Sequence, residues 1–116
     1  MIGIKRAILL LLLALPLVAT AQEKKKVACI GNSVTYGYTH KKPAETSSPT
    51  RLQEMLGNEY EVRNFGHSGA TLLSKGHNPY IKLPEYKAAL EFAPDIAIIH
   101  LGLNDTDPRN WPNSRD

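Results

Sequence analysis

The sequence predicts an α/β fold in which a parallel sheet is covered by helices. Three segments have the apolar or alternating patterns of strands, at residues 27–30, 60–65 and 96–101. Two segments with helical spacing lie between them, at residues 48–56 and 84–93. The order strand, helix, strand, helix, strand favours parallel strands joined by right-handed crossover connections.

The first predicted strand, Val27-Ala28-Cys29-Ile30, is a continuous apolar run that ends at Gly31. Unbroken apolar character is typical of a parallel strand that is buried on both faces. Cys29 is the single cysteine of the chain, so no internal disulfide is possible, and we expect a small buried side chain there. The polar stretch that follows, residues 31–48, is expected to be a loop.

Each predicted helix has a start signal and a stop signal. Ser48 followed by Pro49 is an N-cap and first-turn pattern, and Gly57 ends that helix. Pro84 opens the second helix, which ends before Pro94. The apolar residues at helical spacing are Leu52, Met55 and Leu56 in the first helix and Tyr86, Ala89 and Leu90 in the second.

The two later strands differ in pattern. Residues 60–65 alternate between two faces, whereas residues 96–101 are almost wholly apolar and give the strongest strand signal of the chain. We expect the last strand to be covered on both faces. With only three strands in the chain, one edge of this strand should nevertheless lie open. Residues 66–83 contain three glycines and one proline and are expected to be mostly loop.

The first 21 residues are expected to be a signal peptide and not part of the domain. Two basic residues precede the apolar stretch at residues 7–18, and Ala19-Thr20-Ala21 is a small-x-small cleavage pattern. The alternative, a membrane anchor, needs roughly 20 apolar residues to span the bilayer. We therefore expect cleavage after Ala21, a secreted or periplasmic product, and one domain at residues 22–116.

The charge balance gives little reason to expect a nucleic-acid partner. Removal of the signal leaves 12 basic and 11 acidic residues. Residues 24–26, all lysine, form the one basic run and fit a solvated linker. We expect no membrane anchor after cleavage. No metal or cofactor is implied, and no feature of the sequence sets the oligomeric state.

Three polar segments, each begun by a glycine, directly follow the three predicted strands. In parallel α/β sheets, ligand chemistry gathers beyond the carboxyl ends of the strands. Ser33 follows the first strand on a turn that can expose its hydroxyl, as a nucleophile requires. Gly69 can offer a backbone N–H, and Asn104 a side-chain N–H, to an oxyanion, with the Ser33 N–H as a third donor. These residue types together predict acyl transfer.

The same segments resemble the conserved blocks of the SGNH/GDSL hydrolases. Residues 30–37, Ile-Gly-Asn-Ser-Val-Thr-Tyr-Gly, resemble the first block. Residues 64–71, Asn-Phe-Gly-His-Ser-Gly-Ala-Thr, resemble the second, and residues 102–105, Gly-Leu-Asn-Asp, the third. The resemblance implies a three-layer, flavodoxin-like SGNH hydrolase fold, with Ser33 as nucleophile and with Gly69 and Asn104 completing the oxyanion hole.

Two departures from the family pattern stand out. Asn32 occupies the position of the aspartate in the family's name-giving motif, which is not the acid of its catalytic triad. The family's last block is Asp-x-x-His, whose histidine is the general base, and no aspartate of this chain has a histidine three residues later. The resemblance therefore implies a C-terminally truncated domain that is inactive alone. His67 is expected to line the pocket or to be a surface residue, and His100 to be a core or strand-end residue.

An exported family member with this first block resembles carbohydrate O-acetylesterases, including those of the sialate type. The implied activity is ester hydrolysis by a serine acyl-enzyme mechanism on a small-molecule or glycan ester. Lysophospholipase, arylesterase and thioesterase activities occur on the same scaffold. An alternative from another class is a non-catalytic glycan-binding module on a degenerate esterase fold. An Asp-x-x-His block encoded beyond Asp116 would favour the enzyme, and a stop codon would favour the module.

Overall fold

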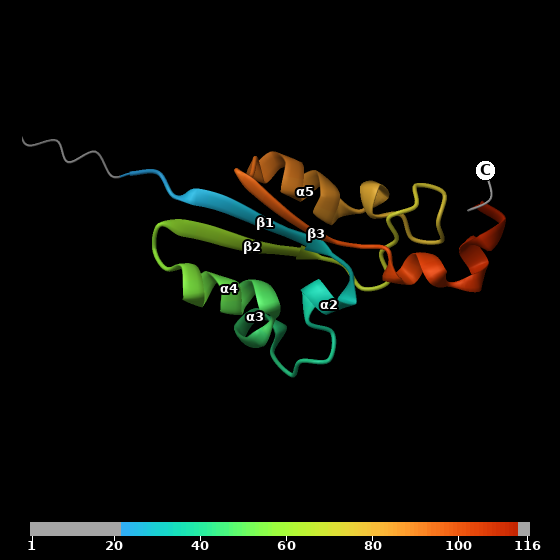
Figure 1. Ribbon diagram of the computed structural model, residues 1–116, viewed down its shortest axis with the longest axis horizontal. Helices are drawn as coiled ribbons and strands as arrows, with labels where there is room; N and C mark the ends of the chain where they lie inside the picture. Colours follow the sequence, from blue (N-terminus) through green and yellow to red (C-terminus); the bar gives the residue numbers. More distant parts are fainter. Residues whose placement is uncertain (1–21, 114–116) are drawn as a thin grey trace, which may run out of the picture.

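A three-stranded parallel sheet organises the chain, with β1 (Lys25–Gly31) at its centre between β2 (Tyr60–Gly66) and β3 (Ile96–His100) (Figure 1). The structure is a computed structural model that describes residues 22–113. The predicted signal peptide, residues 1–21, lies outside the described residues. The α/β class, the parallel sheet and the order of strands and helices along the chain are confirmed.

Helices lie on both faces of this sheet, which gives the three layers that were expected (Figure 1). The α-helices are α2 (Ser33–Tyr36), α3 (Pro43–Thr46), α4 (Ser48–Leu56) and α5 (Pro84–Phe92). The 3₁₀ helices are η1 (Tyr80–Lys82), η2 (Leu103–Thr106) and η3 (Pro108–Asn113). Helix α5 covers one face of the sheet, and α2, α3 and α4 lie on the other (Figure 1).

The three strands end level with one another. Gly31, the last residue of β1, pairs with Gly66 of β2 and with His100 of β3. The three polar segments that follow the strands therefore begin at one common edge. This register places the expected site residues at that edge.

A small apolar core holds α5 against the sheet. It comprises Ala28, Phe65, Ala89 and Phe92, all buried. The rings of Phe65 and Phe92 lie 5.5 Å apart between centroids in a tilted arrangement, which is a favourable geometry for an aromatic pair. Val27 and Cys29 flank Ala28 in β1, so their side chains point to the opposite face of the sheet. Both are buried there. Burial raises the pKa of the Cys29 thiol, as expected for a small buried side chain.

The expectation that β3 is covered on both faces is wrong for the part of the chain that the structure describes. Ile96, Ile98 and Ile99 are 45%, 45% and 63% exposed. Among residues 22–113, β3 pairs only with β1, so it is an edge strand with one open side, as expected from the strand count. Its apolar sequence is therefore not matched by burial among these residues.

The polar stretch after β1 is not a plain loop, because it contains α2 and α3. The side chain of Asn32 accepts a hydrogen bond from the Val34 N–H at 3.0 Å and caps α2, which ends at Gly37 with a φ of 89°. Helix α4 is preceded by Ser47 as N-cap, one residue earlier than expected. Two apolar residues assigned to helix faces, Met55 and Leu90, are exposed.

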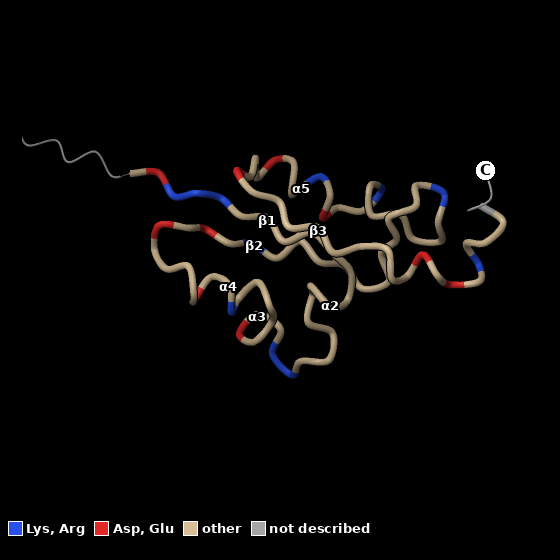
Figure 2. Tube along the Cα trace, in the orientation of Figure 1, with Lys and Arg blue, Asp and Glu red and all other residues tan. Residues whose placement is uncertain are grey.

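Charged residues of both signs are spread over the helical layers and the loops (Figure 2). The longest basic stretch enters β1 at residues 24–26, as expected for a solvated segment. Among residues 22–113, no helix has the length and apolar character needed to cross a membrane.

Candidate active site

Ser33 lies directly beyond the carboxyl end of β1, where it begins α2. The turn is tight, because a Cβ at Gly31 would overlap the side chain of Thr35 and lie 2.9 Å from the carbonyl oxygen of His100. Asn32 is completely buried and fixes the turn from inside by capping α2. Since Ser33 is the first helical residue, its backbone N–H has no partner within the helix.

The backbone N–H of Gly69 lies on the loop that follows β2. Gly69 has a φ of 83°, a left-handed conformation that favours glycine. Its neighbours anchor the loop: the His67 N–H donates to the Gly31 carbonyl at 2.9 Å, and the Ala70 N–H donates to the His67 carbonyl at 3.2 Å. Among residues 22–113 the Gly69 N–H itself has no hydrogen-bond acceptor.

Asn104 follows β3, which lies on the opposite side of β1 from β2, and it contacts the same loop. It lies in η2, after Gly102 with its φ of 113°. Its side-chain nitrogen donates to the carbonyl oxygen of Ala70 at 3.0 Å, and its own carbonyl accepts from the Asn110 side chain at 3.0 Å. An amide nitrogen carries two hydrogens, so one N–H remains for a ligand.

The structure thus links the three expected site residues through their neighbours. Asn104 contacts the residue next to Gly69, and the loop of Gly69 is joined to the turn of Ser33 through the His67–Gly31 hydrogen bond. Ser33 Oγ has no hydrogen bond to a histidine or carboxylate within residues 22–113. The Gly69 N–H and one hydrogen of the Asn104 amide are left without acceptors, and residues 22–113 provide no proton acceptor for the Ser33 hydroxyl.

Four histidines are described, and none of them has a hydrogen bond to Ser33 Oγ. His40 Nδ1 is 2.8 Å from Thr46 Oγ1, and His77 contacts Asn110. His100 lies at the exposed end of β3, which fits a strand-end residue and not a core residue. His67 Nδ1 is 2.9 Å from Glu85 Oε1, with both side chains about one third exposed, at 35% and 31%.

Asp105, the last residue of the third polar segment, anchors the loop after β2, a role that was not predicted from the sequence. One carboxylate oxygen accepts from the Leu72 N–H at 2.9 Å, and the other accepts from the Leu73 N–H at 2.7 Å. Asn110, completely buried, adds a further tie, because its side-chain oxygen accepts from the His77 N–H at 2.7 Å. Together these contacts fasten residues 70–77 to the segment that carries Asn104.

Asn64 holds the nucleophile turn against β2 in a similar way. Its side-chain nitrogen donates to the Thr35 carbonyl at 3.0 Å, and its side-chain oxygen accepts from the Gly66 N–H at 2.9 Å. A Cβ at Gly66 would overlap the backbone of Tyr36. The close approach of β2 to α2 therefore depends on this glycine.

Hydrogen bonds from Arg109 stabilise the ionised form of Asp107 at the start of η3. The Arg109 guanidinium donates to the carboxylate at 3.0 and 2.9 Å, and the Arg109 N–H donates to it at 2.9 Å. These contacts hold the pKa of Asp107 well below its usual range. The negative charge beyond β3 is thus neutralised locally by the adjacent arginine.

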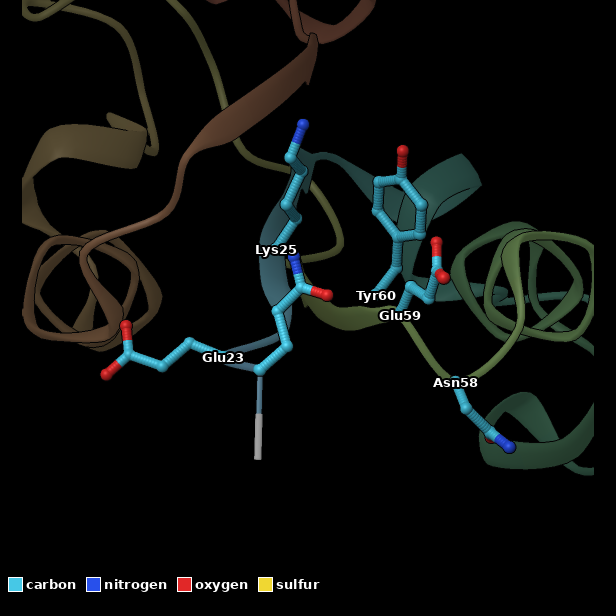
Figure 3. Close-up of a pocket in the computed structure, with 6 residues that line it drawn as sticks. Glu23, Lys25, Asn58, Glu59 and Tyr60 are labelled. Carbon is cyan, nitrogen blue, oxygen red and sulfur yellow. The ribbon is translucent and has the colours of Figure 1, made fainter. Parts of the chain in front are cut away.

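Ser33 itself lines a small hollow, and a larger one of about 630 Å³ adjoins it on the side of Val34, Thr35 and His100. The smaller hollow has a volume of about 160 Å³ and is lined by Ser33, Val34, Gly37, Tyr38, Thr39 and His40. A cavity of about 340 Å³ lies where β1 and β2 begin, at the opposite end of the strands, and its lining includes Glu23, Lys25 and Tyr60 (Figure 3). That cavity is remote from the loops that carry the expected site. Among residues 22–113 no group of three or more His, Cys, Asp or Glu side chains is placed to hold a metal.

Comparison with known proteins identifies a matching family model and similar molecules. The model of the GDSL-like lipase/acylhydrolase family matches residues 29–116. An acetylxylan esterase of Xylanibacter ruminicola is 45% identical over 93 residues, which cover 80% of this chain and 19% of that protein. The crystal structure of AlinE4, an SGNH-hydrolase family esterase, and that of its D162A mutant are each 28% identical with a TM-score of 0.55.

The matches differ in length from this chain. It spans less than a fifth of the acetylxylan esterase, because only 19% of that protein is covered. Its alignment with AlinE4 covers 74% of this chain and 44% of the esterase. The described residues therefore correspond to one portion of longer molecules.

Proposed function

We propose that this chain carries the nucleophile and the oxyanion-binding groups of a serine esterase. The chain belongs to the GDSL-like lipase/acylhydrolase family, whose model matches residues 29–116. The observation that supports the proposal most is the hydrogen bond from the Asn104 side chain to the Ala70 carbonyl. It brings two of the three expected donors to neighbouring positions although they are far apart in the sequence. The same sheet edge carries Ser33.

In the proposed reaction the Ser33 hydroxyl attacks the ester carbonyl and gives its proton to a general base. The negative oxygen of the tetrahedral intermediate accepts hydrogen bonds from the N–H groups of Ser33 and Gly69 and from the Asn104 side chain. Collapse of the intermediate breaks the ester C–O bond, and the alcohol leaves with the proton. Water then hydrolyses the acyl-serine by the same two steps.

The base is proposed to come from an Asp-x-x-His segment outside these 116 residues. A serine hydroxyl is a weak nucleophile at neutral pH and needs an adjacent base. The described residues place no histidine on Ser33 Oγ, and the relatives of this chain are longer than it is. Alone, the chain is expected to bind an oxyanion without rapid turnover.

The proposed substrate is an O-acetyl ester of a carbohydrate. The support is the similarity to an acetylxylan esterase, at 45% identity over 93 residues. This similarity covers 80% of the chain, whereas substrate choice within one fold is set by individual site residues.

The test compares the 116-residue chain with a polypeptide extended through the next Asp-x-x-His. Acetate release from acetylated xylan and hydrolysis of p-nitrophenyl acetate are measured for both, with Ser33→Ala as the negative control. We expect turnover by the extended polypeptide that is lost in Ser33→Ala, and little by the short chain. Binding of the glycan by both polypeptides without acetate release would instead favour a non-catalytic glycan-binding module.

A further inference from the structure

His67 and Glu85 form an imidazole–carboxylate pair beside the loop that carries Gly69. His67 Nδ1 lies 2.9 Å from Glu85 Oε1. The backbone of His67 is fixed on both sides, because its N–H donates to the Gly31 carbonyl and its carbonyl accepts from the Ala70 N–H. The residue thus lies between the nucleophile turn and the proposed oxyanion loop.

The carboxylate determines how the imidazole ring presents its other nitrogen. An ionised carboxylate only accepts hydrogen bonds, so Nδ1 carries the hydrogen in this contact. Nε2 is then an acceptor when the ring is neutral and a donor when it is protonated. Among residues 22–113 no hydrogen-bond partner is found for Nε2. Either form can therefore bind a hydroxyl group of a ligand.

The surroundings of Glu85 indicate that the carboxylate depends on His67. Its second oxygen, Oε2, is buried and has no hydrogen-bond partner within residues 22–113. The nearby Tyr80 hydroxyl does not serve it, because that group donates to the Phe65 carbonyl at 2.6 Å. Burial and then the charge of Glu85 raise the pKa of Tyr80 to about 12. A buried carboxylate oxygen without a partner is costly, and the contact with His67 is the one side-chain hydrogen bond of Glu85 among residues 22–113.

We propose that His67 is a substrate-positioning residue that binds a hydroxyl of the alcohol half of the ester through Nε2, with Glu85 holding the ring in place. The inference rests on the proposed esterase function. The expected oxyanion donors contact the acyl half of an ester, and His67 lies two residues before Gly69 on the same loop. A carbohydrate supplies hydroxyls for this contact, whereas an aryl leaving group does not.

The competing role for His67 is general base for Ser33, and it predicts a different kinetic pattern. A base acts on the serine hydroxyl whatever the leaving group, so its loss would lower kcat on every ester. A hydroxyl-binding residue acts only on substrates that carry the hydroxyl. A site that hydrogen-bonds a substrate hydroxyl discriminates against analogues that lack it.

The test uses the polypeptide extended through Asp-x-x-His, with an acetylated xylo-oligosaccharide and p-nitrophenyl acetate as substrates. We expect His67→Phe to raise KM for the oligosaccharide about 10-fold, the order of one lost hydrogen bond, with kcat/KM on p-nitrophenyl acetate within about 2-fold. Glu85→Gln should give a smaller change in the same direction. Glu91→Gln, the same substitution at an exposed position of α5, is the matched control.

Two results would overturn the proposal. An equal loss on both substrates would assign His67 to the base or to the fold, and unchanged kinetics on both would show that it does not contact the substrate. His67→Gln retains a polar side chain of similar length and is the second variant to measure if His67→Phe does not fold. Circular dichroism and the thermal midpoint of each variant verify the fold.

A binding measurement separates this inference from failure of the esterase function. In the Ser33→Ala variant, the imidazole NMR signals of His67 are followed while the acetylated xylo-oligosaccharide is added, with the ring signals of Tyr60, at the opposite end of the strands, as internal reference. A shift confined to His67 supports the contact even if no turnover is found. Absence of a shift at saturating oligosaccharide overturns it. Hydrolysis of p-nitrophenyl acetate without hydrolysis of the oligosaccharide would contradict the carbohydrate assignment and retain the reaction class.

Discussion

The side-chain nitrogen of Asn104 lies 3.0 Å from the carbonyl oxygen of Ala70 and donates a hydrogen bond to it. The bond crosses 34 residues of sequence and joins the segment after β3 to the loop after β2. Because it uses one of the two amide hydrogens, it orients the side chain and leaves the second hydrogen for a ligand. Asn104 thus belongs to the framework of the loop as well as to the proposed oxyanion site.

Asn104→Ala in the extended polypeptide is expected to lower kcat by roughly 100- to 1,000-fold, the usual cost of one oxyanion donor. KM should change much less, because the contact is stronger in the transition state than in the ground state. Initial rates on p-nitrophenyl acetate give both constants. Asn58→Ala, an exposed position at the other end of the strands, is the control. A kcat within a few-fold of the wild type would remove Asn104 from the oxyanion hole.

Asp105→Ala is expected to loosen the loop that carries Gly69. The substitution leaves the N–H groups of Leu72 and Leu73 without their carboxylate acceptor. Hydrogen bonds to a charged group contribute about 2 kcal/mol each, so both amides should exchange faster with solvent. Amide hydrogen exchange followed by NMR measures this directly. Unchanged protection of these two amides would show that the contacts do not persist in solution.

Phe92→Ala is expected to lower the free energy of unfolding by about 3–5 kcal/mol, because it opens a cavity in the core. Phe92 is buried against Phe65, and the guanidinium of Arg63 lies 4.5 Å from its ring centroid. Leu90→Ala, on the same helix at 60% exposure, should change stability by less than about 0.5 kcal/mol. Urea unfolding of both variants gives the comparison. Similar losses from both would contradict the core as described.

Export is proposed from the N-terminal pattern of the sequence. The precursor should be cleaved between Ala21 and Gln22 and released without its first 21 residues. Intact-mass analysis of protein recovered outside the cytoplasm checks the mass of the product. Retention of Met1 on the exported protein would contradict this prediction.

The sequence predicted the regular elements well where the pattern is local. The apolar runs at β1 and β3, the alternation of β2 and the proline and glycine signals at the helix ends are properties of neighbouring residues. The shared edge of the three polar segments followed from their positions after parallel strands. Helices α2 and α3 were missed because polar segments with glycine and proline are also typical of loops.

Contacts between distant residues could not be predicted in the same way. Asp105 meets the Leu72 and Leu73 amides across 33 and 32 residues, and His67 meets Glu85 across 18 residues. Neither pairing has a signature in local spacing. The exposure of β3 was missed for a related reason, since burial depends on the elements that surround a strand and not on its own apolar character.

The most direct test of the central claim is covalent labelling of the extended polypeptide by a fluorophosphonate probe, with the modified residue identified by mass spectrometry. An activated serine beside an oxyanion hole should react with the probe, so we expect a single adduct on Ser33 that Ser33→Ala abolishes. Denatured protein is the control for nonspecific modification. An adduct on another residue, or labelling that persists in Ser33→Ala, would contradict the assignment of Ser33 as the nucleophile.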